Sequence, residues 1–205
     1  MRPVPHYFDE SPAVASSTTM IEVPVPGGRL ELQTDHGVFS HGRLDAGTAV
    51  LLREAPDPPA AGDLLDLGCG SGPIALSLAH RAPAATVWAL DVNGRARQLC
   101  AANAAANGLG NVRAVAPEDV PADVRFAAVW SNPPIRIGKP ALHALLLDWL
   151  GRLSPGGTAL LVVHKHLGAD SLQRWLSDHG HPATRHASRS GYRLLAVAKS
   201  RSDDP

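Results

Sequence analysis

The chain has 205 residues, 44% of them hydrophobic, and its 19 Lys and Arg balance its 19 Asp and Glu. A chain of this length can bury one ordinary hydrophobic core, so one main domain is expected. The zero formal charge argues against a protein that holds long nucleic acid by charge alone, because phosphate binding needs clustered cations.

The first sixty residues are predicted to form an N-terminal appendage (residues 1–60) before a catalytic domain (61–205). Pro26-Gly27-Gly28 separates two alternating runs and predicts a β-hairpin. Asp45 is a plausible N-cap for a helix. The predicted segments are an irregular stretch at 1–20, strands at 21–25 and 29–34, a helix at 45–54 and a Pro-rich linker at 55–62.

From residue 63 onward, short apolar runs alternate with helical patterns. We predict strands at 63–67, 86–90, 112–115, 126–130 and 158–163, helices at 73–81, 94–107, 141–153 and 169–179, a turn at 154–157, and a C-terminal hairpin at 182–188 and 192–198. Such alternation is typical of right-handed βαβ units. The expected fold is therefore an α/β, doubly wound, Rossmann-like sheet, mostly parallel, with an antiparallel hairpin at one edge.

A glycine-rich loop joins the first strand of the catalytic domain to its first helix. Asp66 precedes it, and Gly68, Gly70 and Gly72 give the spacing G-x-G-x-G, with Pro73 where a dinucleotide enzyme has its third glycine. Glycine permits positive φ and a close approach of ligand to backbone. A carboxylate here would repel a pyrophosphate but suits the amino group of a cationic amino acid, which favours S-adenosylmethionine over NAD.

Acidic residues after the next two strands extend the predicted cofactor site. Asp91 ends a strand about twenty residues beyond the loop, where a carboxylate can accept both ribose hydroxyls. Alternatively, Asp91 caps the helix that follows. Glu118 or Asp119, after the third strand, would contact the adenine edge, and the sequence does not choose between them.

The segment Ser131-Asn132-Pro133-Pro134 follows the fourth strand, at the edge where doubly wound sheets bind ligands. The exocyclic amine of a base is a poor nucleophile because its lone pair is delocalised into the ring. The Asn132 side-chain oxygen and the Pro133 carbonyl would accept its hydrogens, and the prolines would hold both acceptors in place. The alternative is a turn in which Asn132 caps local backbone. Together with the glycine loop, the motif predicts methyl transfer to a planar nitrogen.

These motifs resemble those of the small-subunit ribosomal RNA guanine-N2 methyltransferase family, in its form with a single catalytic domain. The matching segments are His6-Tyr7-Phe8, 34–40, Asp45-Ala46-Gly47-Thr48, 66–72, 132–139 and Gly191-Tyr192-Arg193. The resemblance implies a class I methyltransferase sheet and methyl transfer from S-adenosylmethionine to the N2 amine of a guanine in 16S ribosomal RNA. It also implies ribosomal RNA or the small ribosomal subunit as partner, with the enzyme a monomer or homodimer.

By the same resemblance, Phe39 would stack on the target base or act as a lid. Pro134 would also contact the substrate. Arg136 and Lys139 would approach RNA phosphate or the base. Two alternatives stay open: another acceptor for the same chemistry (a protein glutamine amide, DNA adenine or a small molecule), or a catalytically silent RNA-binding module. Arginines at 185, 189 and 193 further suggest a basic edge near the substrate.

Cys69 and Cys100 lack the spacing of metal ligands and suggest no disulfide framework, so no metal site is predicted. The N-terminus lacks the apolar core of a signal peptide. No uncharged apolar stretch approaches the length of a membrane span. We therefore expect a cytoplasmic protein without membrane contacts.

Overall fold

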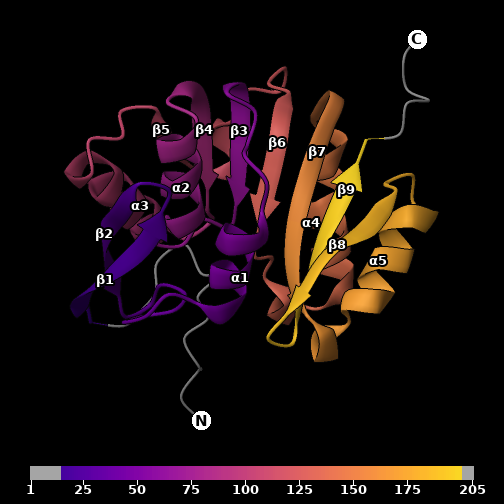
Figure 1. The fold of residues 1–205 in the computed structure, drawn as a ribbon, viewed down its shortest axis with the longest axis horizontal. Helices are drawn as coiled ribbons and strands as arrows, with labels where there is room; N and C mark the ends of the chain where they lie inside the picture. Colours follow the sequence, from indigo (N-terminus) through magenta and orange to yellow (C-terminus); the bar gives the residue numbers. More distant parts are fainter. Residues whose placement is uncertain (1–14, 200–205) are drawn as a thin grey trace.

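The computed structural model describes residues 15–199, so the His6-Tyr7-Phe8 segment lies outside the described residues. Figure 1 shows the arrangement of the strands and helices. In chain order these are β1 (Thr18–Val25), β2 (Gly28–Asp35), α1 (Ala46–Glu54), β3 (Ala61–Leu67), α2 (Pro73–Arg81), β4 (Ala84–Leu90), α3 (Gly94–Ala106), β5 (Val112–Val115), β6 (Phe126–Ser131), α4 (Lys139–Gly151), β7 (Leu153–His164), α5 (Ala169–Asp178), β8 (Ala183–Arg189) and β9 (Tyr192–Ala198). Among the helices of residues 15–199, none is long and apolar enough to cross a membrane.

A seven-stranded sheet runs in the order β5-β4-β3-β6-β7-β9-β8, and β1 and β2 form a separate antiparallel hairpin. The first five strands pair in parallel, whereas β9 pairs antiparallel with both β7 and β8. This confirms the predicted doubly wound sheet with its C-terminal antiparallel hairpin. The strand order reverses between β3 and β6, and sheets of this kind bind ligands at the carboxyl ends of the strands beside that reversal.

Helices cover both faces of the sheet because successive side chains of β3 point to opposite faces. Leu64 belongs to the core formed with the hairpin, α1, α2 and α3, whereas Leu65 belongs to the core formed with α4 and α5. Both leucines are fully buried. In Figure 1, α1 and α2 lie in front of the sheet and α4 lies behind it.

Several predicted boundaries differ from the structure. β1 begins at Thr18 and β3 at Ala61, inside segments predicted to be irregular and linker, because pairing with β2 and β4 extends both strands. Residues 154–157, predicted to form a separate turn, are assigned to β7, but they have no partner in the ladder with β6, because Phe126 pairs with Leu153 and Ala128 with Thr158. They therefore form a bulge within β7, with Gly156 at a φ of +75°.

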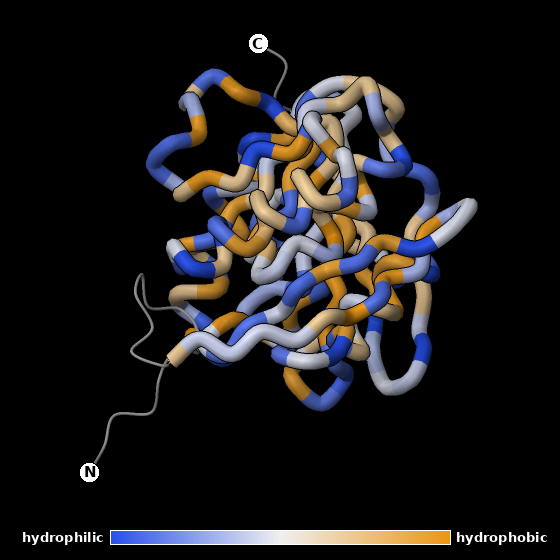
Figure 2. The backbone as a smooth tube through the Cα atoms, turned by 90° about the vertical axis from the view of Figure 1, so that its left-hand side faces the viewer, coloured by the Kyte–Doolittle hydropathy of each residue, from blue (hydrophilic) through white to orange (hydrophobic). Residues whose placement is uncertain are grey.

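The β1–β2 hairpin is amphipathic. Leu30 and Leu32 are buried in the core, whereas Glu31 between them is exposed. Figure 2 shows this alternation of hydrophobic and hydrophilic residues along the two strands that cross the front of the view. One face of the hairpin therefore packs on the catalytic domain and orders the segment that leads from β2 to α1.

Asn103 of α3 and Asn107, the C-cap residue of that helix, fix the edge of β2. The Asn103 Oδ1 accepts from the Gln33 amide at 2.8 Å, and its Nδ2 donates to the carbonyls of Gln33 at 2.9 Å and Ser71 at 2.8 Å. One turn later, Asn107 makes the same reciprocal pair with the backbone of Glu31, at 3.1 and 2.8 Å. These side chains pair with alternate residues of β2 as a neighbouring strand would.

We expect Asn103→Ala to lower the free energy of unfolding by about 2–3 kcal/mol, because three backbone groups lose their partners in a buried environment. Asn107→Ala, at a more exposed position, should cost about 1 kcal/mol. Urea unfolding of both variants measures the difference. Equal losses at the two positions would contradict this description of the hairpin contact.

Candidate active site

The ends of β3 and β6 meet at the centre of the sheet. Asp66 pairs with Trp130 in the parallel register, and the Ser131 hydroxyl donates to the Leu67 carbonyl at 2.6 Å. The residues that follow, Gly68 and Asn132, line one cavity. The two motifs singled out in the sequence thus lie next to each other at the edge where ligand binding is expected.

The glycine loop has a backbone that other residues rarely adopt. Gly68, Gly70 and Gly72 have φ of +83°, +54° and +95°. A Cβ on Gly72 would lie 2.7 Å from the Cys100 Sγ and 2.8 Å from Leu76. A Cβ on Gly68 would meet nothing within 4 Å, so this glycine leaves open space on the cavity side. The loop is therefore packed against Cys100 and Leu76 on one side and open to the cavity on the other.

Asp66 lies beneath this loop and is fully buried. Its Oδ2 accepts from the Ala75 amide at 2.9 Å, whereas its Oδ1 has no hydrogen-bond partner. Burial, together with the nearby charge of Asp91, raises the pKa of Asp66 to about 8, against the opposing Ala75 amide. A buried carboxyl oxygen without a partner is a group that a cation satisfies, and the amino group of S-adenosylmethionine is one, although Asp66 itself is not among the residues that line the cavity.

Cofactor binding is expected to strengthen as the pH rises from about 6 to about 8, because the cationic amine binds the ionised form of Asp66 and the free carboxyl must lose a proton first. Above about pH 8 the amine itself loses its charge, and binding should weaken. Isothermal titration calorimetry at several pH values tests this. Asp66→Asn should lose the rise between pH 6 and 8, and an unchanged rise in that variant would contradict the assignment.

Asp91 connects the glycine loop to the end of β4. Its Oδ2 accepts from the Gly70 amide at 2.9 Å and its Oδ1 from the Asn93 amide at 2.9 Å. Burial raises the pKa of Asp91, although these backbone amides oppose the rise. The alternative that Asp91 caps α3 was wrong, since the Asn93 side chain accepts from the first amides of that helix. The Asp91 carboxylate keeps acceptor capacity for a further donor, as a role at the ribose requires.

Glu118 and Asp119 lie in the short 3-10 helix η1 (Pro117–Asp119) after β5, and both are exposed. The Asp119 Oδ2 accepts from the Ala116 amide at 3.4 Å. Neither residue lines the cavity that Gly68 and Asn132 share. Asp119 thus makes a local backbone contact. A contact of Glu118 or Asp119 with the adenine edge stays a prediction.

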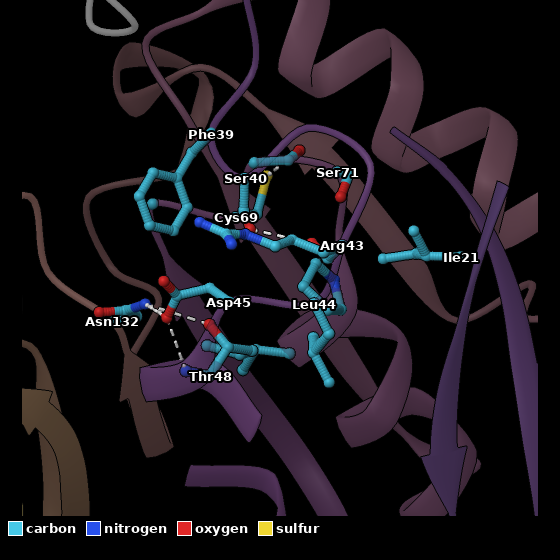
Figure 3. A pocket seen from close by; sticks show the side chains of 14 residues that line it. Ile21, Phe39, Ser40, Arg43, Leu44, Asp45, Thr48, Cys69, Ser71 and Asn132 are labelled. Carbon is cyan, nitrogen blue, oxygen red and sulfur yellow. Dashed lines mark hydrogen bonds between the residues drawn. The ribbon is translucent and has the colours of Figure 1, made fainter. Parts of the chain in front are cut away.

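The side-chain amide of Asn132 is held in one orientation. Its Nδ2 donates to the Asp45 Oδ2 at 2.8 Å and to the Thr48 Oγ1 at 3.1 Å. Since a carboxylate accepts hydrogen bonds and an amide oxygen cannot donate, the nitrogen must face Asp45. Figure 3 shows the Asn132 oxygen on the side of the amide away from Asp45. The site therefore offers a hydrogen-bond acceptor, as the proposed contact with an amine requires.

Asp45 and Thr48 were missed as site residues. Asp45 was expected only as an N-cap, and it does accept from the Thr48 amide at 3.0 Å at the start of α1. Both residues also line the cavity. The available signal was the segment Asp45-Ala46-Gly47-Thr48 in the family resemblance, but nothing in the sequence placed it opposite Asn132.

The residues predicted to contact substrate are only partly brought together. Phe39 lines the cavity and is 49% exposed. The Pro133 carbonyl accepts from the Ile135 amide at 2.8 Å and retains one lone pair. Pro134 precedes the 3-10 helix η2 (Ile135–Ile137), which carries Arg136, and Lys139 begins α4. These last two side chains are exposed and lie outside the cavity lining.

A doubly wound sheet in which a glycine loop and an Asn-Pro-Pro segment meet at the carboxyl ends of β3 and β6 defines an S-adenosylmethionine-dependent methyltransferase of class I. The chain belongs to the methyltransferase small domain family, whose sequence model matches residues 29–196.

The chain is also similar to known proteins over most of its length. It is 32% identical over 197 residues to the uncharacterized protein YbxB of Bacillus subtilis, covering 95% of this chain and 98% of that protein. It is 35% identical over 182 residues to ribosomal RNA small subunit methyltransferase C of Pseudomonas aeruginosa, covering 87% of this chain but 54% of that protein. The chain thus spans about half the length of the Pseudomonas relative and almost all of the Bacillus one.

The fold also matches a solved structure of the T. thermophilus 16S rRNA N2 G1207 methyltransferase in complex with AdoMet and guanosine. The TM-score is 0.77 at 23% sequence identity, over 92% of this chain and 52% of that one. At this identity the match supports the fold, and the roles of individual residues must come from the site itself.

Proposed function

We propose that this methyltransferase transfers a methyl group to the exocyclic N2 amine of a guanine in small-subunit ribosomal RNA. The observation that carries the proposal is the Asn132 amide, whose oxygen is left free as an acceptor beside the glycine loop. The similarity to a Pseudomonas ribosomal RNA small subunit methyltransferase over most of the chain supports this acceptor.

Bound S-adenosylmethionine supplies an activated methyl group, and Asp66, the glycine loop and Asp91 are the residues that would hold it. The Asn132 oxygen, with the Pro133 carbonyl, accepts the hydrogens of the target amine and favours the pyramidal nitrogen that can attack. Rigid acceptors of this kind act by positioning and electrostatics and need no strong base.

Around this centre, Phe39 offers a half-exposed ring on which a base can stack. Arg136 and Lys139 are exposed after the Asn-Pro-Pro segment, and we assign them contacts with RNA phosphate outside the cavity. The arginines of the proposed basic edge have acidic partners: Arg185 and Arg193 pair with Asp170, at 3.6 and 2.8 Å, and Arg189 pairs with Glu54 at 2.8 Å.

The direct test is transfer of labelled methyl from S-adenosylmethionine to unmodified small ribosomal subunits, with naked 16S RNA alongside and the product nucleosides identified. We expect the label in N2-methylguanosine. Parallel reactions contain a glutamine peptide, adenine-containing DNA and small-molecule acceptors. Label in one of these and not in RNA would contradict the proposal, as would cofactor binding without transfer to any acceptor.

A further inference from the structure

We propose that Asp45 and Thr48 are positioning residues for methyl transfer: they lock the Asn132 amide so that its oxygen meets the target amine. The inference rests on the proposed function, because it assigns a role within that site. It also gives the N-terminal appendage a part in catalysis beyond that of a lid, since both residues belong to the start of α1.

Both hydrogens of the Asn132 side-chain amide are engaged. An asparagine amide has two N–H groups, and those of Asn132 are directed at the Asp45 carboxylate at 2.8 Å and the Thr48 hydroxyl at 3.1 Å. Turning the amide over would place its oxygen against the Asp45 carboxylate and lose the charge-assisted hydrogen bond. The turned amide would also present N–H groups to an amine that itself donates. One orientation is therefore competent and the other is not.

Asp45 and Thr48, the two partners of the Asn132 amide, are themselves held in place. The Asp45 carboxylate caps α1 through the Thr48 amide at 3.0 Å. Thr48 is 3% exposed, so its hydroxyl has little freedom to turn away. The partners of Asn132 are thus held by a helix terminus and by packing.

Gly47 and Tyr192 support the same segment from behind. A Cβ on Gly47 would lie 2.8 Å from the Tyr192 Cε1 and 3.0 Å from the Asp45 Oδ2. The absence of a side chain at position 47 therefore lets the tyrosine ring approach without displacing the carboxylate. The contacts around Asn132 therefore require a carboxylate at position 45, no side chain at position 47 and a hydroxyl at position 48.

Substitutions can distinguish an effect on the orientation of the Asn132 amide from an effect on the stability of the fold. Asp45→Asn keeps a good N-cap and nearly the same shape, but its new amide can also donate, so it no longer dictates which way Asn132 turns. Thr48→Val removes the hydroxyl at nearly constant shape, and Thr48→Ser retains the hydroxyl. Thr48→Ser is the matched control, because it is smaller than the native residue yet preserves the contact.

We expect Asp45→Asn to lower kcat by about 10- to 100-fold, the effect of losing a hydrogen bond to a charged group, and Thr48→Val by about 3- to 10-fold. Thr48→Ser should stay within about threefold of the native kcat, and all three should bind S-adenosylmethionine within about twofold of the native Kd. Native kcat in both Asp45→Asn and Thr48→Val would overturn the proposal. Equal losses in Thr48→Val and Thr48→Ser would also overturn it, since packing would then be the cause.

An exchange of the two groups tests orientation directly. Asn132→Asp alone places two carboxylates within hydrogen-bond distance, and such a pair cannot ionise fully. The double variant Asp45→Asn/Asn132→Asp restores a donor opposite a carboxylate, whose other oxygen still faces the amine. We expect its kcat to exceed that of Asn132→Asp at least about fivefold at neutral pH. No recovery would contradict the proposed orientation.

A readout without an acceptor separates this proposal from the proposed function. In NMR spectra of the native protein, the Asn132 side-chain amide hydrogens, assigned by their loss in Asn132→Ala, should exchange slowly with water. They should lose protection in Asp45→Asn and Thr48→Val but not in Thr48→Ser. If guanine is not methylated but this pattern holds, only the acceptor is wrong; fast exchange in the native protein would overturn the positioning role.

Discussion

Asn132→Ala is expected to lower kcat for methyl transfer by at least about 100-fold, the size of effect seen when a fixed hydrogen-bonding group is removed from a reacting centre. The variant loses the acceptor oxygen that Asp45 and Thr48 orient. The Kd for S-adenosylmethionine should change by no more than about twofold, because the glycine loop and Asp91 are untouched.

The measurement is single-turnover methyl transfer together with calorimetric binding of the cofactor. Asn107→Ala is a suitable control, since it removes an asparagine amide that does not line the cavity, on the hairpin contact. If Asn132→Ala transferred methyl at the native rate, the role of the Asn-Pro-Pro segment would be wrong. Loss of cofactor binding would instead mean that Asn132 acts on the loop.

Gly72→Ala is expected to abolish cofactor binding and to lower the free energy of unfolding by about 2–4 kcal/mol. The added Cβ meets the Cys100 Sγ at 2.7 Å and Leu76 at 2.8 Å, at a φ of +95° that alanine rarely adopts. Relief of these contacts must shift the loop between β3 and α2, whose backbone also carries Gly68 and Gly70.

Gly108→Ala provides the matched comparison. Gly108 has a φ of +69°, but a Cβ there would meet nothing within 4 Å. Gly108→Ala should therefore lower the free energy of unfolding by the backbone strain alone, about 1–2 kcal/mol, and leave cofactor binding unchanged. Thermal unfolding with and without S-adenosylmethionine distinguishes the two variants. Native cofactor binding by Gly72→Ala would contradict the packed loop described here.

The catalytic sheet and its two motifs were predictable because their signals are local. Short apolar runs, the glycine spacing and Asn132-Pro133-Pro134 each lie within a few residues, and the rule that parallel strands bind ligands at their carboxyl ends brings them together. Boundaries failed where strand pairing extends an element beyond its local signal, as at Thr18 and Ala61, which pair with Asp35 of β2 and Ala84 of β4.

The contacts of Asn132 could not be predicted in this way. Asp45 and Thr48 lie 87 and 84 residues before it in the chain. Their meeting depends on how α1 packs against the sheet, which periodicity does not reveal. A similar limit applied to the C-terminal arginines, whose regular spacing suggested a free basic edge until Asp170 and Glu54 were found beside them.

Methylation of the N2 amine of a guanine in small-subunit ribosomal RNA through Asn132 is the activity that we propose for this site. Mass spectrometry of 16S RNA from cells that lack the gene, with and without complementation, tests it most directly. We expect one N2-methylguanosine to be lost in those cells and to be restored by the native gene but not by Asn132→Ala. Identical N2-methylguanosine at every site in the deleted and native cells would contradict it.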